Sequence, residues 1–198
     1  MKNIVFDMGN VLINYDPEHF VARAGVDSPE DRELLLDAVF RSPQWPLLDL
    51  GEMDEAGLEA VALPRLPERL HAVARDLIHH WEVPMEPIPG MADFIRECRD
   101  RGCGVYLLSN ASVRQREYWD HIPGREYFDG AVVSAYEHCV KPMPGIYVAL
   151  LERYGLRAED CLFVDDMQPN VDGAVAVGMR GFRFTGDIDA LRRAAFPE

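Results

Sequence analysis

Five short hydrophobic runs along the chain each end in polar or small residues. They are rich in valine, leucine, isoleucine and phenylalanine. Continuous hydrophobic runs of this length are typical of strands that are buried on both faces of a parallel sheet. The predicted strands cover residues 4–6, 104–108, 130–133, 161–164 and 180–184.

Hydrophobic positions recur at helical spacing between several of these runs. Residues 91–101 place hydrophobic side chains on one helical face, and Gly102 then offers a C-terminal cap. The same pattern covers residues 144–154 and 169–177, each followed by a glycine. This alternation predicts an α/β protein with a doubly wound, mainly parallel five-stranded sheet of the Rossmann-like kind.

One interval breaks the alternation, because roughly ninety residues separate the first two predicted strands, far more than a single crossover needs. Helix-start signals occur in it at Asp16-Pro17 and Ser28-Pro29, where a capping side chain precedes a proline. Further helical stretches cover residues 53–61 and 66–81. We therefore expect a core domain of residues 1–14 and 85–198 and an inserted helical cap domain of residues 15–84.

The composition predicts a globular protein. Hydrophobic residues make up 48% and charged residues 27% of the 198 residues, which excludes a disordered or fibrous chain. No run approaches the roughly 20 apolar residues of a membrane helix, and the first residues lack a signal-peptide pattern. The four cysteines form no Cys-x-x-Cys pair, as expected for buried thiols and not for zinc ligands. We expect a cytoplasmic location.

The formal net charge of −14 narrows the choice of partners. Such a surface repels nucleic acid and anionic membranes, so we expect neither as a partner. It also repels a small phosphorylated substrate at long range. If the substrate is anionic, a local cation must overcome this repulsion, which points to a metal ion together with a lysine.

Polar side chains gather where the predicted strands end. In an open α/β sheet the binding site lies beyond the carboxyl ends of the strands, so these side chains should converge. They are Asp7 after the first strand, Ser109 and Asn110 after the second, Lys141 shortly after the third, and Asp165 and Asp166 after the fourth.

These residue types suit the transfer of a phosphoryl group. A carboxylate such as that of Asp7 can attack phosphorus and form an aspartyl-phosphate. Because two anions must approach each other, a cation is needed, and Asp7 with Asp166 would suit Mg²⁺. Lys141 would screen the charge, and the Ser109 hydroxyl with nearby backbone N–H groups would bind the phosphoryl oxygens.

The segments that contain these residues resemble, in chain order, the four motifs of the haloacid dehalogenase-like (HAD) hydrolase superfamily: Phe6-Asp7-Met8-Gly9-Asn10-Val11, Leu107-Leu108-Ser109-Asn110, Lys141-Pro142 and Val164-Asp165-Asp166. Residues 15–84 match the position of its helical C1 cap. The first motif, together with residues 141–147, is most similar to a subgroup of small bacterial sugar phosphatases that includes an α-D-glucose-1-phosphatase. The resemblance covers essentially the whole chain.

The resemblance implies a role for each motif residue. It makes Asp7 the nucleophile and a ligand of Mg²⁺, and it makes Lys141 the residue that stabilises charge. It places the substrate against Ser109, Asn110 and Gly9. The implied metal ligands are Asp7, Asp166, the backbone carbonyl of Gly9, and Asp165 either as a ligand or as a neighbour of one.

The chain departs from the family pattern at one position. The family usually has a second aspartate two residues after the nucleophile, which acts as general acid and base, whereas this chain has Gly9. General acid–base help is worth about 10²–10⁴-fold in rate. Asp16 or a water molecule could substitute. The similar sugar phosphatases share the glycine, so the departure does not imply an inactive protein.

The expected function is a Mg²⁺-dependent phosphatase that acts on small phosphate monoesters, with sugar phosphates favoured by the subgroup resemblance alone. A haloacid dehalogenase needs no metal, so the Asp165-Asp166 pair argues against it. A phosphomutase normally relies on the aspartate that Gly9 replaces. A non-catalytic binding protein is the remaining alternative, and only Gly9 favours it. The sequence leaves open a monomer or a homodimer.

Side chains of the cap should select the substrate, but the sequence does not identify them. Tyr15, His19, Trp45 and residues 79–81 are candidates. A single histidine or tryptophan on a helix more often packs against its neighbours, so we expect packing. Asn170 is equally consistent with a polar residue at the start of a helix and with a member of the site.

Overall fold

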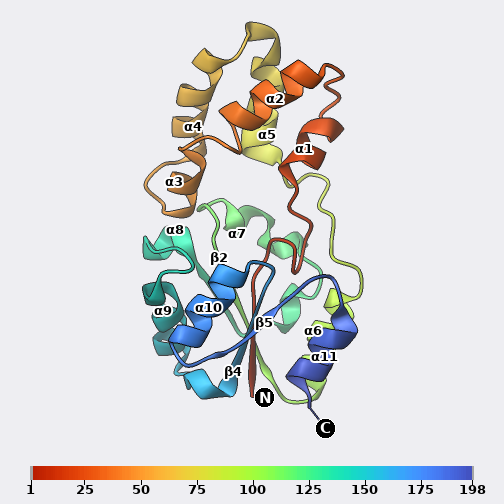
Figure 1. Cartoon of the computed structure of the whole chain (residues 1–198), viewed down its shortest axis with the longest axis vertical. Helices are drawn as coiled ribbons and strands as arrows, with labels where there is room; N and C mark the ends of the chain where they lie inside the picture. Colours follow the sequence, from red (N-terminus) through yellow and green to blue (C-terminus); the bar gives the residue numbers. More distant parts are fainter. Residues whose placement is uncertain (1, 198) are drawn as a thin grey trace.

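A computed structural model describes residues 2–197 of the chain. Within them, five parallel strands form one sheet in the order β3-β2-β1-β4-β5 (Figure 1). The predicted fold class, a doubly wound parallel α/β sheet, is confirmed. The strands are β1 (Asn3–Phe6), β2 (Gly104–Ser109), β3 (Gly130–Val133), β4 (Cys161–Asp165) and β5 (Arg180–Arg183).

Strand β1 lies in the middle of the sheet and pairs with β2 on one side and β4 on the other. Ile4 and Phe6 belong to one hydrophobic cluster and Val5 to another, because successive side chains of a strand point to opposite faces. All three side chains are fully buried. A strand covered on both faces reads as a continuous hydrophobic run, as the sequence pattern predicted.

Helices cover both faces of the sheet (Figure 1). The helices α6 and α11 pack on the face of Phe6, whereas α9 and α10 pack on the face of Val5. The helices predicted at 91–101, 144–154 and 169–177 are confirmed to within a residue, but α11 was not predicted. The bounds are α6 (Met91–Asp100), α9 (Pro144–Tyr154), α10 (Gln168–Ala176) and α11 (Ile188–Ala195).

A separate group of helices lies beyond the carboxyl ends of the strands (Figure 1). This helical segment has its own hydrophobic cluster, in which Phe20, Leu35, Leu58 and Ile78 are buried. Its helices are α1 (Pro17–Arg23), α2 (Pro29–Ala38), α3 (Trp45–Asp49), α4 (Glu55–Ala62) and α5 (His71–His80), with short 3₁₀-helices at Leu63–Arg65 and Glu68–Leu70.

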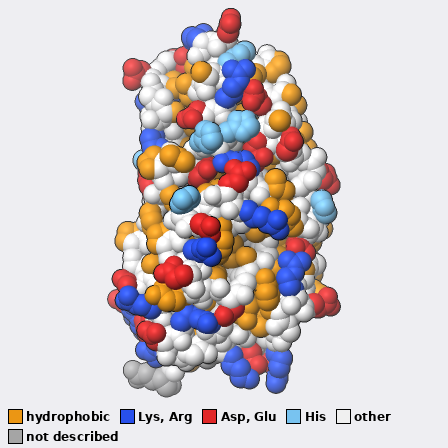
Figure 2. Space-filling model, turned by 180° about the vertical axis from the view of Figure 1, so that it is seen from behind, with side chains coloured by type: hydrophobic (Ala, Val, Ile, Leu, Met, Phe, Trp, Pro, Cys, Tyr) orange, Lys and Arg blue, Asp and Glu red, His pale blue; other side chains and the backbone are white. Residues whose placement is uncertain are grey.

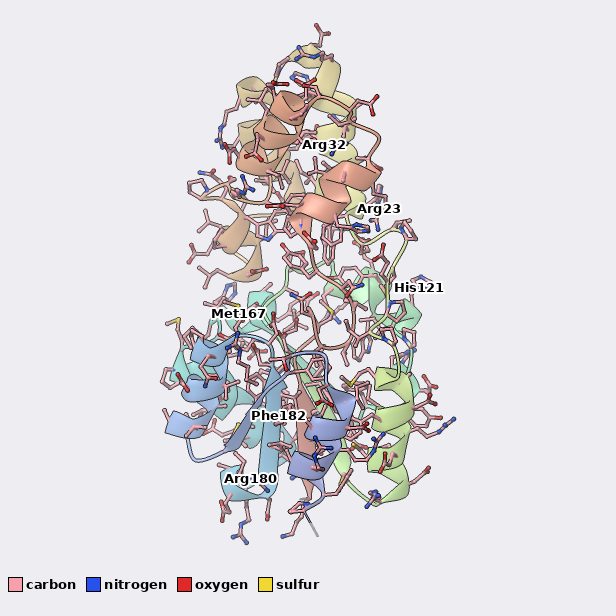
Figure 3. The ribbon with its side chains drawn as sticks, turned by 45° about the vertical axis from the view of Figure 1, so that its right-hand side comes forward. Arg23, Arg32, His121, Met167, Arg180 and Phe182 are labelled. Carbon is pink, nitrogen blue, oxygen red and sulfur yellow. The ribbon has the colours of Figure 1, made fainter. Side chains whose placement is uncertain are left out.

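Two connections join the helical segment to the sheet, and they run side by side. Ile13 and Pro87 form an antiparallel bridge, and the backbone N–H of Asn14 donates to the Glu86 carbonyl at 2.8 Å. The guanidinium of Arg23 donates to backbone carbonyls of the second connection, including that of Val83 at 2.7 Å. These bonds tie the helical segment to the second connection; Figure 3 labels Arg23 on the helical segment.

Local capping explains where the helices of the segment begin. The Asp16 carboxylate accepts hydrogen bonds from the first backbone N–H groups of α1, and the Ser28 hydroxyl accepts one at the start of α2. Both predicted helix starts are confirmed. The helix predicted over 66–81 is shorter, because Leu66 is extended and the α-helix begins only at His71.

Several short helices connect the larger elements, and the hydrophobic pattern had not predicted them. Each has fewer than six residues, which is too short for a 3.6-residue periodicity to be recognised. They are α3, α7 (Gln115–Tyr118), α8 (Ser134–Glu137) and 3₁₀-helices at Trp119–His121, Arg125–Tyr127 and Ala158–Asp160.

The charged surface and the absence of disulfides among the described cysteines are those expected from the composition. Acidic and basic side chains are interspersed over the face that Figure 2 shows. Cys98, Cys103 and Cys161 are buried, Cys139 is half-buried, and no disulfide joins the four. Among the described residues, no helix combines the length and the hydropathy that crossing a bilayer requires.

Candidate active site

A cleft of about 520 Å³ lies between the carboxyl end of the sheet and the helical segment. Asp7, Asn110, Lys141 and Asp166 line its lower part. Met167, labelled in Figure 3, lies on the core side of the cleft, just after the end of β4. The polar residues at the strand ends therefore converge where the sheet topology predicted.

Lys141 joins two of the predicted carboxylates. Its Nζ lies 2.6 Å from Asp7 Oδ1 and 2.7 Å from Asp165 Oδ2. The lysine side chain is 1% exposed, and those of Asp7 and Asp165 are 12% and 0% exposed. Three charged groups are thus almost entirely removed from water, and each compensates another. Asp7 keeps the greatest exposure of the three, on the side of the cleft.

Neighbouring amides hold this cluster in place. The Asn110 side chain accepts a hydrogen bond from the backbone N–H of Lys141 at 2.8 Å and donates one to the Lys141 carbonyl at 3.2 Å. The Asn170 amide donates to both oxygens of Asp165, each at 3.1 Å. The backbone N–H of Met167 also donates to Asp165, at 2.8 Å. Lys141 is therefore fixed both at its backbone and through its carboxylate partner.

For both Asp7 and Lys141, burial and the neighbouring charges shift the pKa in opposite directions. Burial raises the pKa of the Asp7 carboxyl to about 7, although the positive charge of Lys141 opposes the rise. Burial lowers the pKa of Lys141, but the carboxylates of Asp7 and Asp165 outweigh it, so the net pKa of the lysine is raised. Lys141 is consequently held in its charged form, in direct contact with the Asp7 carboxyl.

Asp166 is a further carboxylate of the cleft. Its Oδ2 accepts a hydrogen bond from the Asn10 amide at 3.1 Å, and Asn10 Oδ1 in turn accepts one from the Tyr15 N–H at 2.9 Å. Asn10 has φ 54°, a left-handed conformation that asparagine tolerates better than most residues. The tight turn after β1 thereby directs the Asn10 side chain onto Asp166.

Three carboxylates could hold a metal ion. Asp7, Asp165 and Asp166 each offer an oxygen, and these oxygens lie within 4.8 Å of one another. An all-oxygen set of this kind suits Mg²⁺. Both oxygens of Asp165 already accept hydrogen bonds, whereas Asp166 keeps an oxygen without a donor among the described residues. The residues present therefore fit the metal that the sequence predicted.

Gly9 lines the cleft together with Asp7, whereas Ser109 is buried and is not among the cleft-lining residues. Ser109 is 1% exposed at the end of β2, and its hydroxyl makes one long contact, at 3.5 Å, with the Asn110 carbonyl. Gly9 lines the cleft, and a Cβ added to it would meet the Tyr15 Cβ at 3.4 Å. Asp16, suggested as a replacement for the missing acid, caps α1 with its carboxylate and does not line the cleft.

The helical segment contributes residues that the sequence did not identify. Asp49, at the end of α3, lines the cleft, and so does Glu55 at the start of α4. The Ser112 hydroxyl donates to Glu55 at 2.6 Å, which ties α4 to the loop after β2. In the sequence, Gly51 is the residue that could have indicated a close approach of this region to the core. A Cβ there would lie 2.2 Å from the Ala135 carbonyl oxygen, so α3 can approach the core only because residue 51 is a glycine.

The aromatic candidates line the cleft, whereas His19 and His79 do not. Tyr15, Trp45 and Trp81 pack with other aromatic rings, as expected, and they also line the cleft. His19 pairs with Glu86 at 2.8 Å, outside the cleft. The His79 ring pairs in the same way with a glutamate of α4, at 3.2 Å. Asn170 belongs to the site through Asp165.

The model of the haloacid dehalogenase-like hydrolase family matches residues 1–178. The chain therefore belongs to this family of hydrolases, as its four motifs had predicted. The match spans strands β1 to β4, the helical segment and every residue of the carboxylate–lysine cluster described above.

Similar proteins are known with assigned activities. The sesquiterpene phosphatase of Aspergillus oryzae is 28% identical over 197 residues, covering 94% of this chain and 91% of that protein. The fructose-1-phosphate phosphatase of Escherichia coli is 24% identical over 180 residues, covering 89% and 92%. A HAD family enzyme of Bacteroides thetaiotaomicron, solved with magnesium and inorganic phosphate, shares the fold with a TM-score of 0.69 and 22% identity, covering 96% and 98%.

Proposed function

We propose that this protein is a Mg²⁺-dependent phosphatase, which hydrolyses small phosphate monoesters through an aspartyl-phosphate on Asp7. The observation that carries the proposal is the contact of 2.6 Å between Lys141 and a partly exposed Asp7 carboxylate, at the edge of a cleft. The two curated relatives named above are both called phosphatases, which supports the same reaction class.

Asp7 and Asp166 would hold Mg²⁺, together with the backbone carbonyl of Gly9. When bound, the ion would neutralise charge between the attacking carboxylate and the phosphoryl oxygens. Asp165 was predicted as a ligand or as a neighbour of one. Its four hydrogen-bond contacts with Lys141, Met167 and Asn170 favour the second role, in which it orients the lysine.

The chain's own residues would divide the remaining work. Lys141 would hold Asp7 in position and stabilise the negative charge that develops on the phosphoryl group. The Ser109 hydroxyl and backbone N–H groups near Gly9 and Asn110 would bind the non-bridging oxygens. The Asn110 side chain would act indirectly, because both its polar atoms already bind the backbone of Lys141.

We propose the division into a core domain of residues 1–14 and 85–198 and a cap domain of residues 15–84. The cap helices supply the upper wall of the cleft, so their position would exclude bulk water from the phosphoryl group. The Glu55–Ser112 hydrogen bond would help to hold the cap against the core.

The two relatives are named for substrates with different organic groups. One relative is named for a sugar phosphate and another for a sesquiterpene, so these names support two different classes. Sugar phosphates, a cytoplasmic location and a monomeric or homodimeric state stay predictions from the sequence.

The proposal is tested by the release of inorganic phosphate from p-nitrophenyl phosphate. We expect turnover with Mg²⁺, loss of turnover in EDTA and recovery when Mg²⁺ is added back. Asp7→Asn should abolish turnover, whereas Asp16→Asn should leave turnover and its pH profile unchanged, because Asp16 only caps α1. Phosphate release that survives EDTA or Asp7→Asn would refute the proposal. A phosphomutase would instead return the phosphoryl group to an organic acceptor.

A further inference from the structure

The upper part of the cleft is hydrophobic. Tyr15 lies where the chain enters the helical segment, and Trp45 and Leu48 come from α3. Ile78 and Trp81 come from the end of α5 and the residue after it. These side chains face the carboxylate–lysine cluster across the cleft, and Tyr118 of α7 completes the wall.

Most polar groups around the cleft already have partners. Glu55 accepts from Ser112, and Asn110 is bound to the backbone of Lys141. Asn10 donates to Asp166 and accepts from the backbone of Tyr15. A sugar has several hydroxyl groups, each of which must be hydrogen-bonded when it leaves water. This wall offers few free partners for them.

The cleft is also larger than a phosphate group requires. Its volume of about 520 Å³ falls in the range of roughly 300–1,000 Å³ that is typical of pockets for drug-sized organic ligands. The phosphoryl group would occupy only the end near Lys141 and Asp7. The remaining space is bordered by aromatic and aliphatic side chains, which gain from contact with an apolar ligand.

We propose that the substrate is a phosphate monoester of a bulky hydrophobic alcohol, whose apolar part fills the space between Trp45, Leu48, Ile78 and Trp81. This rests on the proposed phosphatase function and adds the class of the leaving group. Burial of the apolar part contributes to catalytic efficiency in proportion to the surface removed from water.

A chain-length series tests this class in the unmodified protein. With Mg²⁺, kcat/KM should rise from methyl to butyl to octyl phosphate, by up to about fourfold for each methylene until the cleft is full. Octyl phosphate should exceed glucose 1-phosphate and fructose 1-phosphate by at least about tenfold, given the same hydrophobic gain. A flat series, or sugar phosphates equal to or better than octyl phosphate, would overturn the proposal. Absence of turnover even on p-nitrophenyl phosphate would instead refute the phosphatase function.

A matched pair of variants locates the effect. Trp45→Ala removes a ring that lines the cleft, whereas Trp119→Ala removes a half-buried ring that packs on Phe128 and does not line it. We expect Trp45→Ala to flatten the chain-length series while kcat/KM for methyl phosphate changes little. Trp119→Ala should keep the slope of the wild type. The reverse pattern, or an equal effect of both variants, would contradict the assignment.

A second, independent observation concerns Asp49. Among the described residues its carboxylate has no hydrogen-bond or ion-pair partner, although it lines the cleft. Lys141 of the core and the phenols of Tyr15 and Tyr118 interact with it electrostatically. Glu55 is the other acidic residue of the cap that lines the cleft. Burial raises the pKa of Asp49 to about 7, with Lys141 opposing the rise.

We infer that Asp49 supplies the proton-transfer function that Gly9 lacks. As the Asp7 oxygen bonds to phosphorus, the bond from phosphorus to the ester oxygen breaks, and the Asp49 carboxyl gives its proton to the departing alcohol. In the second step water attacks phosphorus and gives one proton to a phosphoryl oxygen, while Asp49 regains its proton from the solvent. The new P–O bond then displaces the Asp7 carboxylate and releases inorganic phosphate.

The dependence on leaving group distinguishes proton transfer from a merely structural role. Asp49→Asn should lower kcat for octyl phosphate by about 10²–10⁴-fold, since an alkoxide is a poor leaving group without a proton. The same variant should retain most activity on p-nitrophenyl phosphate, whose leaving group needs no proton. Glu52→Gln, which removes an exposed carboxylate three residues away, is the matched control and should match the wild type.

The pH profile gives a second readout. In the wild type, kcat for octyl phosphate should fall as the pH rises above about 7, because the protonated carboxyl of Asp49 is the active form. Asp49→Asn should lose this alkaline decline. An equal loss on both esters, or no loss on octyl phosphate, would overturn the role of Asp49, while activity of the wild type on p-nitrophenyl phosphate would leave the phosphatase function standing.

Discussion

Replacement of Lys141 by methionine should destabilise the folded protein severely. The lysine is 1% exposed and contacts Asp7 at 2.6 Å and Asp165 at 2.7 Å. Methionine keeps the apolar stem but removes the charge, which leaves two buried carboxylates beside each other. Removal of one partner from a buried ion pair costs about 3–5 kcal/mol. For a chain of this size, each kcal/mol lowers Tm by about 2–4 °C, so we expect a loss of roughly 6–20 °C.

Thermal unfolding followed by circular dichroism measures this loss, with EDTA present so that no metal replaces the lysine. The matched control is Lys2→Met, because the chain has only two lysines. Lys2 contacts Asp160 at 2.9 Å but is 70% exposed, and exposed ion pairs contribute little. Its Tm should stay close to that of the wild type.

The pH dependence of the loss has a definite sign. Without Lys141 the pKa of Asp7 in the folded state should rise further above its unfolded value than the present value of about 7. The folded variant then holds a proton that the unfolded chain releases, so its stability falls as the pH rises. The gap between wild type and variant should widen from pH 5 to pH 8. Equal Tm values for Lys141→Met and Lys2→Met at pH 8 would refute this account of the cluster.

Three further outcomes follow from the same contacts. Asp49→Asn should raise Tm at pH 8 and change it little at pH 4. A folded-state pKa of about 7 for Asp49 makes the wild-type protein lose stability as the pH rises from 4 to 7, and the variant removes this loss. An unchanged Tm at pH 8 would argue against burial of the carboxyl. Asn110→Ala should lower kcat by at least about tenfold with little change in KM, since it only holds the Lys141 backbone; an effect confined to KM would point to substrate contact. Ser112→Ala should speed amide hydrogen exchange of α4 by about tenfold or more, because the hydrogen bond to Glu55 ties that helix to the core, and unchanged exchange would contradict this.

The strands and the cluster at their ends could be predicted because they depend on short contiguous signals. A strand buried on both faces leaves a hydrophobic run, and parallel strands bring their carboxyl ends together whatever the distance along the chain. Asp7 and Lys141 are far apart in sequence, yet the parallel sheet places the ends of β1 and β3 at the same edge, where Asn110 holds the Lys141 backbone. The positions of these residues therefore follow mainly from the strand order and from the point at which each strand ends.

The upper wall of the cleft could not be predicted in the same way. Helix α3 has five residues and no side-chain cap at Gln44, so neither periodicity nor capping marks it. Its position depends on tertiary contacts, including the close approach of Gly51 to Ala135 and the hydrogen bond of 3.0 Å between the His138 ring and the Leu50 carbonyl. The place of Asp49 in the cleft therefore depends on tertiary contacts that no local sequence pattern marks.

Covalent capture of the phosphoryl group on Asp7 tests the central claim most directly. The protein is mixed with p-nitrophenyl phosphate and Mg²⁺, quenched in acid within a turnover and digested for mass spectrometry. We predict a phosphoryl group on the peptide that contains Asp7, labile to hydroxylamine and absent from Asp7→Asn. Phosphate release without any such adduct, or an adduct on another residue, would contradict the account.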